Sequence, residues 1–196
     1  MNWGELKAAV VGYLHRADAS AMMPVWLTLA EQRIYFGEQN TQPLRLAAMI
    51  RRVTLAGPAR PADFLEARKV LVSGGAHDRP LEYRPLERLP LETRAFSWDG
   101  QNMVLSPDMD WPVQLLYYGR LDTPSVDGDS NWLLQNVPGV YLAAMLIEAA
   151  KWSRDELLLV REVANYTSAA SAAQKSDQVA QHSGSPLAAR LSGRVA

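Results

Sequence analysis

Helical periodicity lies at the two ends of this chain and strand-like alternation lies between them, and this separation most constrains the fold. Apolar residues recur at helical spacing near the N-terminus and again from Pro138 onward. Short β-favouring runs and turn dipeptides fill residues 45–119. Because helices and strands do not alternate, the pattern favours a mainly helical α+β fold over a parallel α/β sheet. We predict an N-terminal and a C-terminal helix pair flanking a small antiparallel β region, with helices over residues 2–16, 24–37, 138–153 and 155–175.

Local signals mark the ends of several of these elements. Asn2 is followed three residues later by Glu5, which is the spacing of a capping box. Pro24 suits the first turn of a helix and Gly37 suits a helix end. Between two alternating runs, the dipeptide 99–100 reads Asp-Gly and predicts a two-residue type I′ hairpin turn.

The last stretch of the chain, residues 176–196, has a different composition. It is rich in small and polar residues, and such a segment buries too little apolar surface to offset the entropy of ordering it. Arg190 and Arg194 give it a mild positive charge, since no acidic side chain follows Asp177. From composition alone, the segment is either disordered without a role or an extended C-terminal arm that orders on a neutral or acidic partner. We predict a folded domain over residues 1–175.

Composition excludes several classes of protein. The 20 basic and 21 acidic side chains give a net charge of -1, so no overall field directs the chain to nucleic acid or to anionic membrane. The absence of cysteine excludes disulfides, thiolate zinc sites and cysteine nucleophiles. The N-terminus does not follow the plan of a signal peptide, and the apolar runs fall short of a membrane span. We expect a protein made in the cytosol that does not associate with a membrane.

No catalytic constellation is visible in the sequence. His15, His77 and His182 lie in different segments without partners at metal-ligand spacing, and there is no glycine-rich phosphate loop. Residues 127–131 match the first half of a calcium loop, but Trp132 stands at the required glycine position. We interpret this loop as a solvated turn whose Ser130 or Asn131 caps the next helix. The sequence predicts no catalytic residue, no cofactor, no metal and no enzymatic activity.

Two alternatives rest on charged side chains. A virion-carried, peptidoglycan-cleaving glycosidase would need two carboxyl groups held across a cleft. Asp108 and Asp110 are candidates, whereas Glu82, Glu87 and Glu92 alternate with arginines as on a solvated face.

A small DNA-binding module is the other alternative. It would use Arg51-Arg52, Arg68-Lys69 and the tail arginines Arg190 and Arg194, but nearby acids dilute the pairs. If this protein meets DNA, we expect it to act as a channel wall in which many copies share one weak field.

The order of several short segments resembles the phage head-to-tail adaptor family, which includes the tail accessory factor of short-tailed phages. The segment Leu29-Ala-Glu-Gln-Arg-Ile34 is similar to the second helix of that family. The resemblance also covers residues 3–10, 24–34, 61–66, 116–120, 131–134 and 182–187.

This resemblance implies a structural virion protein at the head–tail junction, assembled in the host cytoplasm. It implies a ring of twelve copies beneath the portal protein, which extends the DNA channel and offers a platform for tail, nozzle or fibre proteins. It further implies that the C-terminal arm grips the portal, since a ring of arms multiplies weak contacts. The candidate portal-binding residues in the arm are Ser185, Pro186, Leu187, Arg190, Leu191 and Arg194.

Overall fold

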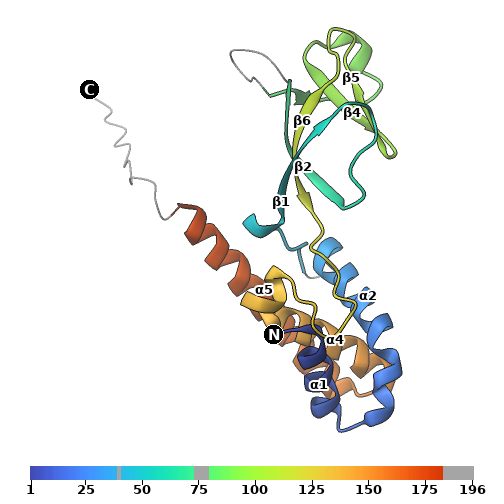
Figure 1. Cartoon of the computed structure of the whole chain (residues 1–196), viewed down its shortest axis with the longest axis vertical. Coiled ribbons are helices and arrows are strands. Elements are labelled where there is room, and N and C mark those ends of the chain that lie inside the picture. Colours follow the sequence, from blue (N-terminus) through green and yellow to red (C-terminus); the bar gives the residue numbers. More distant parts are fainter. Residues whose placement is uncertain (39–40, 73–79, 183–196) are drawn as a thin grey trace, which may run out of the picture.

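The structure is a computed structural model that describes residues 1–38, 41–72 and 80–182. It has a helical part and a β part arranged along the long axis of the molecule (Figure 1). The predicted α+β class is confirmed. The helical part contains α1 (Trp3–Leu14), α2 (Met23–Phe36), α3 (Trp132–Asn136), α4 (Pro138–Ser153) and α5 (Glu156–His182). The β part contains β1 (Ile50–Leu55), β2 (Phe64–Val72), β3 (Glu82–Tyr83), β4 (Ala95–Asp99), β5 (Asn102–Leu105) and β6 (Val113–Gly119).

The ends of the first two helices follow the predicted local signals. The Asn2 side chain accepts from the Glu5 backbone N–H at 2.8 Å, and the Glu5 carboxylate accepts from the Asn2 N–H at 3.0 Å, which completes the capping box of α1. Pro24 lies in the first turn of α2, and Gly37 ends the helix with a φ of 75°. A Cβ at Gly37 would collide with the Thr41 carbonyl oxygen, so both the backbone angle and the available space require glycine.

Helix α4 lies at the centre of the helical part. It packs against α1, α2, α3 and α5, and these helices surround it (Figure 1). A helix that is apolar on all sides is buried on all sides, and α4 has this property. Its buried residues are Val140, Tyr141, Ala143, Ala144, Met145, Leu146, Ile147, Glu148, Ala149 and Ala150.

Glu148 is the charged residue among these, and an ion pair compensates for its burial. The Arg33 guanidinium on α2 lies with Nη2 2.5 Å from Glu148 Oε1, and the two side chains are only 4% and 8% exposed. Glu38 also contacts Arg33, and Lys151 Nζ lies 3.0 Å from Glu148 at the edge of the cluster. The Tyr166 hydroxyl on α5 donates to the Arg33 carbonyl at 3.4 Å. The pair therefore connects α2 to α4 where α5 also packs.

We expect Arg33→Leu to lower the free energy of unfolding by about 3–5 kcal/mol, because it leaves the Glu148 carboxylate buried without its main partner. The double variant Arg33→Leu/Glu148→Leu is expected to recover most of that loss, since apolar replacement of a buried pair is often neutral or stabilising. Urea unfolding followed by circular dichroism measures both. Equal losses in the single and double variants would contradict the expectation.

The β part consists of two three-stranded sheets around a second apolar core. In the first sheet the order is β1-β6-β2, and β6 pairs antiparallel with both neighbours. In the second sheet the order is β3-β4-β5. The two-residue strand β3 runs parallel to β4, whereas the prediction was of an antiparallel region throughout. Along β6, Val113, Leu115 and Tyr117 point into the second core, while the alternate residues point to the opposite face.

The predicted hairpin is confirmed as β4–β5, but its turn differs by one residue. Asp99 pairs with Asn102, so the two loop residues are Gly100 and Gln101. Among the described residues of this loop only Gly100 has a positive φ, at 58°. Glycine at the first central position with an ordinary second residue makes a type II′ turn, which also suits the twist of a hairpin. The type I′ prediction was wrong because Asp99 takes part in the strand pairing.

The fourth predicted helix, over residues 155–175, is longer in the structure. Helix α5 continues to His182, so the prediction of an extended segment from Ser176 onward was wrong for residues 176–182. Tertiary contacts supply the missing stability: Gln174 Nε2 donates to the Pro43 carbonyl at 3.2 Å, and both Asp177 carboxylate oxygens lie 3.0 Å from the Ala47 N–H. The short helix α3 is also additional to the four predicted helices.

Candidate interaction surfaces

The predicted portal-binding residues cannot be placed. Ser185, Pro186, Leu187, Arg190, Leu191 and Arg194 all lie outside the described residues, which end at His182. The structure does show where the described chain ends. Helix α5 leaves the helical part and extends past the junction with the β part (Figure 1).

Glu31 fixes the long loop 120–131 to the helical part. The Glu31 carboxylate accepts from the Thr123 hydroxyl at 2.8 Å and from the Tyr141 hydroxyl at 3.1 Å. In the same cluster, the Tyr35 hydroxyl accepts from the Leu121 N–H at 3.2 Å. Burial raises the pKa of Glu31, and the two hydrogen bonds only partly oppose this effect. Burial likewise raises the pKa of Tyr35 to about 12. This segment of α2, where the family resemblance is concentrated, therefore has a structural role.

The raised pKa of Glu31 predicts a pH-dependent gain in stability for Glu31→Gln. In the folded protein the carboxylate is disfavoured, so wild type loses stability as the pH rises from the unfolded pKa through the folded pKa. The amide has no charge to bury and its oxygen can still accept both hydrogen bonds. We expect the free energy of unfolding of Glu31→Gln, relative to wild type, to increase with rising pH. Below about pH 4 we expect no such increase, because Glu31 is protonated in both the folded and the unfolded state. Thermal unfolding over a pH series measures this, and a difference that shrinks with rising pH would contradict it.

The acidic loop forms a closed turn. The Asp129 carboxylate accepts from the Ser125 and Val126 N–H groups at 2.8 and 2.9 Å, and these backbone bonds lower the pKa of Asp129. The Asp127 carboxylate lies 2.5 Å from Lys7 Nζ on α1. The Asn131 side chain accepts from the Leu134 N–H at 3.0 Å and caps α3, as predicted. Across the described residues, no group of three or more acidic or histidine side chains is placed to hold a metal.

Three of the carboxylates considered for glycoside cleavage, Asp108, Glu82 and Glu92, have local partners. Asp108 accepts from the Ser106 hydroxyl at 2.6 Å and from the Arg94 N–H at 3.1 Å, and the Ser106 bond is the main cause of a lowered pKa at Asp108. A general acid in this chemistry needs a raised pKa. Arg84 lies 2.5 Å from Glu82 and 3.6 Å from Glu92, which matches the predicted mixed-charge face.

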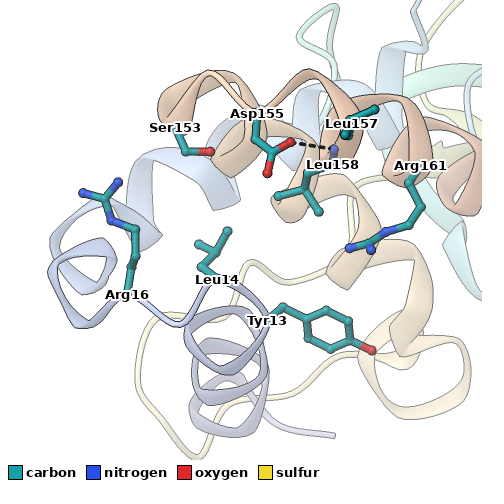
Figure 2. Close-up of a pocket in the computed structure, with 8 residues that line it drawn as sticks. All are labelled: Tyr13, Leu14, Arg16, Ser153, Asp155, Leu157, Leu158 and Arg161. Atoms are coloured by element: carbon teal, nitrogen blue, oxygen red, sulfur yellow. Dashed lines mark hydrogen bonds between the residues drawn. The ribbon is translucent and has the colours of Figure 1, made fainter.

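A groove of about 510 Å³ lies between the end of α1 and the start of α5. Figure 2 shows Arg16 and Arg161 at its two sides and Tyr13 below it. Its charged groups already have partners: Asp155 caps α5 by accepting from the Leu158 N–H at 2.9 Å, and Arg16 pairs with Asp18. No acid, base and nucleophile are brought together here. The lining consists of Tyr13, Leu14, Arg16, Ser153, Asp155, Leu157, Leu158 and Arg161.

Helix α2 presents an exposed face without charge. Val25 is 50% exposed, Leu29 38% and Phe36 59%, which is a strong exposure for large apolar side chains. The two charged residues of this helix, Glu31 and Arg33, point inward and are used in the contacts described above. The exposed positions of α2 are Pro24, Val25, Thr28, Leu29, Gln32 and Phe36.

Helix α5 repeats this distribution with smaller side chains. Between Arg161 and Lys175 its exposed positions carry no charge, and Glu162 is buried, where it pairs with Arg161 at 2.9 Å. The exposed residues are Val163, Ala164, Asn165, Thr167, Ser168 and Ala172. Sequence reasoning missed both faces, although the spacing of Val25, Leu29 and Phe36 was a usable signal.

Comparison with known proteins identifies the family. A model of the SU10 adaptor protein family matches residues 1–190. Curated proteins gave no match. The chain therefore belongs to the SU10 adaptor protein family, which supports a structural role as a phage adaptor and a component of the virion. None of the helices in the described parts of the chain has the length and apolarity needed to cross a membrane.

Proposed function

We propose that this adaptor forms a ring of twelve copies that joins the portal protein to the tail and extends the DNA channel. The observation that carries the proposal is the family match, which spans both parts of the fold and continues beyond α5 to residue 190. The ring sits at the head–tail junction of the virion, is assembled in the host cytoplasm and presents its far side to tail, nozzle or fibre proteins. The protein acts by binding rather than by catalysis.

The uncharged faces of α2 and α5 support ring formation. A ring needs two different surfaces on each copy, because a head-to-tail contact is heterologous. The exposed face of α2 offers bulky apolar groups at Val25, Leu29 and Phe36, and the exposed face of α5 offers small side chains. Large side chains of one helix packing into the grooves of another are the usual geometry of helix contacts. We assign the α2 face of one copy to the α5 face of the next.

Val25→Glu/Phe36→Glu is expected to abolish ring formation without unfolding the subunit, since both side chains are exposed and the introduced charges would be buried only in the ring. Electron microscopy of the protein mixed with its portal, together with light scattering, measures assembly. Leu91→Glu is the matched control, because Leu91 is 90% exposed in the β part and lies outside both faces. Rings formed equally by all three proteins would exclude the α2 face from the contact.

The C-terminal arm is the proposed grip on the portal, through Ser185, Pro186, Leu187, Arg190, Leu191 and Arg194. Its mild positive charge and its few apolar residues suit a segment that orders on binding, and many copies acting together compensate for weak individual contacts. The contacts of α5 indicate where the chain can be truncated without disturbing the folded part. A cut at Ser176 would remove Asp177, which binds the Ala47 N–H, whereas a cut after His182 leaves this contact in place.

Deleting residues 183–196 is expected to leave thermal stability close to that of wild type and to abolish co-sedimentation with the portal. The physical reason is that the deletion spares α5 and its contacts to Pro43 and Ala47. Asp177→Ala in the full chain is the control, since it loosens the end of α5 but keeps the arm. Full portal binding by the deleted protein would show that the grip lies elsewhere.

A further inference from the structure

The outer face of the β1-β6-β2 sheet brings together cations that are distant in the sequence. Arg52 on β1 and Lys69 on β2 are both register partners of Leu116 on the central strand β6. Directly opposed residues of antiparallel strands project to the same side of the sheet. Because Leu115 and Tyr117 point into the second core, Leu116, Arg52 and Lys69 face the other way.

A β-bulge adds a third cation to this face. The register of β2 shifts between Ala67 and Lys69, which leaves Arg68 as the extra residue. The Arg68 guanidinium carbon lies 5.2 Å from the ring centre of Tyr118, on the same side as Leu116. Arg45 approaches the same ring at 5.8 Å. The two arginines therefore converge on one aromatic side chain.

These cations are not neutralised locally. Arg52, Arg68 and Lys69 are exposed, and none of them forms an ion pair with a described residue. Arg45 differs, because its guanidinium lies 2.9 Å from Glu66 and also donates to two carbonyls. With Glu66 cancelling Arg45, the face has three unpaired positive charges on a rigid sheet. We name Arg52, Arg68 and Lys69 the basic face.

We infer that the basic face contacts the phosphate backbone of duplex DNA. Arg52 and Lys69 belong to the two strands that flank β6, which lie about 10 Å apart at the normal strand spacing. Cations held this way can meet successive phosphates without giving up an existing partner. Tyr118 lies under two guanidinium groups and offers no free ring for a base, so the contact is to the backbone and carries no sequence preference.

The chemistry of this face favours DNA over an acidic protein partner. Protein interfaces are depleted in lysine and, although arginine is enriched there, they rely on large apolar and aromatic anchors at their centre. Among the described residues, none of the strongly exposed large apolar side chains comes from β1, β2 or β6. This inference rests on the proposed function, in which DNA passes through the channel of the ring. It identifies the surface of each copy that faces this DNA.

The test measures binding of the full-length protein to a labelled duplex of arbitrary sequence by fluorescence anisotropy over a salt series. Three phosphate contacts predict a slope of about -2.7 in log affinity against log salt. The variant Arg52→Gln/Arg68→Gln/Lys69→Gln is expected to lose most of this slope and at least tenfold in affinity at low salt. Two unrelated duplex sequences are expected to bind equally.

A control variant with the same loss of charge distinguishes an effect of the basic face from an effect of net charge. Arg88→Gln/Arg154→Gln/Lys175→Gln removes three exposed cations outside the sheet and is expected to bind DNA like wild type. Equal weakening in both triple variants, or no DNA binding by wild type at low salt, would overturn the inference. So would unchanged DNA binding with lost portal binding in the sheet variant, which would make the face a protein contact. Ring assembly on the portal is measured separately, so the proposed function can be supported or rejected independently of DNA contact by the basic face.

Discussion

The burial of the middle of α4, from Val140 to Ala150, is the constraint on which the rest of the structure depends. A buried helix segment must satisfy every polar side chain that it carries, and the charged one in this segment is the Glu148 carboxylate. Arg33 supplies the compensating charge, and the Tyr166 hydroxyl holds the same turn of α2 against α5. The buried ion pair therefore joins α2 to α4, and a separate hydrogen bond to the Arg33 carbonyl joins α5 to α2. Its contribution is to orientation, since a buried pair is by itself weak evidence of stability.

Turning charges inward also shapes the outside of the molecule. Glu31 binds Tyr141 and Arg33 binds Glu148, both inside the helical part. Glu162 on α5 is buried and pairs with Arg161. The outer face of α2, and that of α5 between Arg161 and Lys175, are consequently left without charge. In a monomer such faces would favour association, and in the proposed ring they form the contact between copies. The same distribution that stabilises the helical part thus prepares it for assembly.

Helix α5 links the two ends of the proposed assembly. It begins beside the groove near α1, packs along α4 and then extends past the junction with the β part (Figure 1). The bonds from Gln174 to Pro43 and from Ala47 to Asp177 tie it to the connection leading into β1. A rigid helix of this kind gives the arm beyond it a defined starting point. The basic face of the sheet lies in the other part of the same chain, so partner binding and DNA contact are assigned to separate surfaces.

Features governed by neighbouring residues could be predicted from the sequence. The capping box of Asn2 and Glu5, the hairpin around Gly100 and the Asn131 cap each depend on a few adjacent groups. The α+β class followed from the separated periodicities. The alternation of Glu82 with arginines predicted a mixed-charge face, and Arg84 lies 2.5 Å from Glu82.

The sequence by itself determined the order and kind of the elements, because capping, turn chemistry and periodicity act over a few residues. Tertiary structure decided which distant groups meet. Arg33 and Glu148 are 115 residues apart, and the Asp177 carboxylate near the end of α5 accepts from the distant Ala47 N–H. Likewise, the strand register and one bulge gather the basic face from two dilute arginine and lysine pairs. Such contacts depend on how whole elements pack, and no local pattern along the chain encodes that geometry.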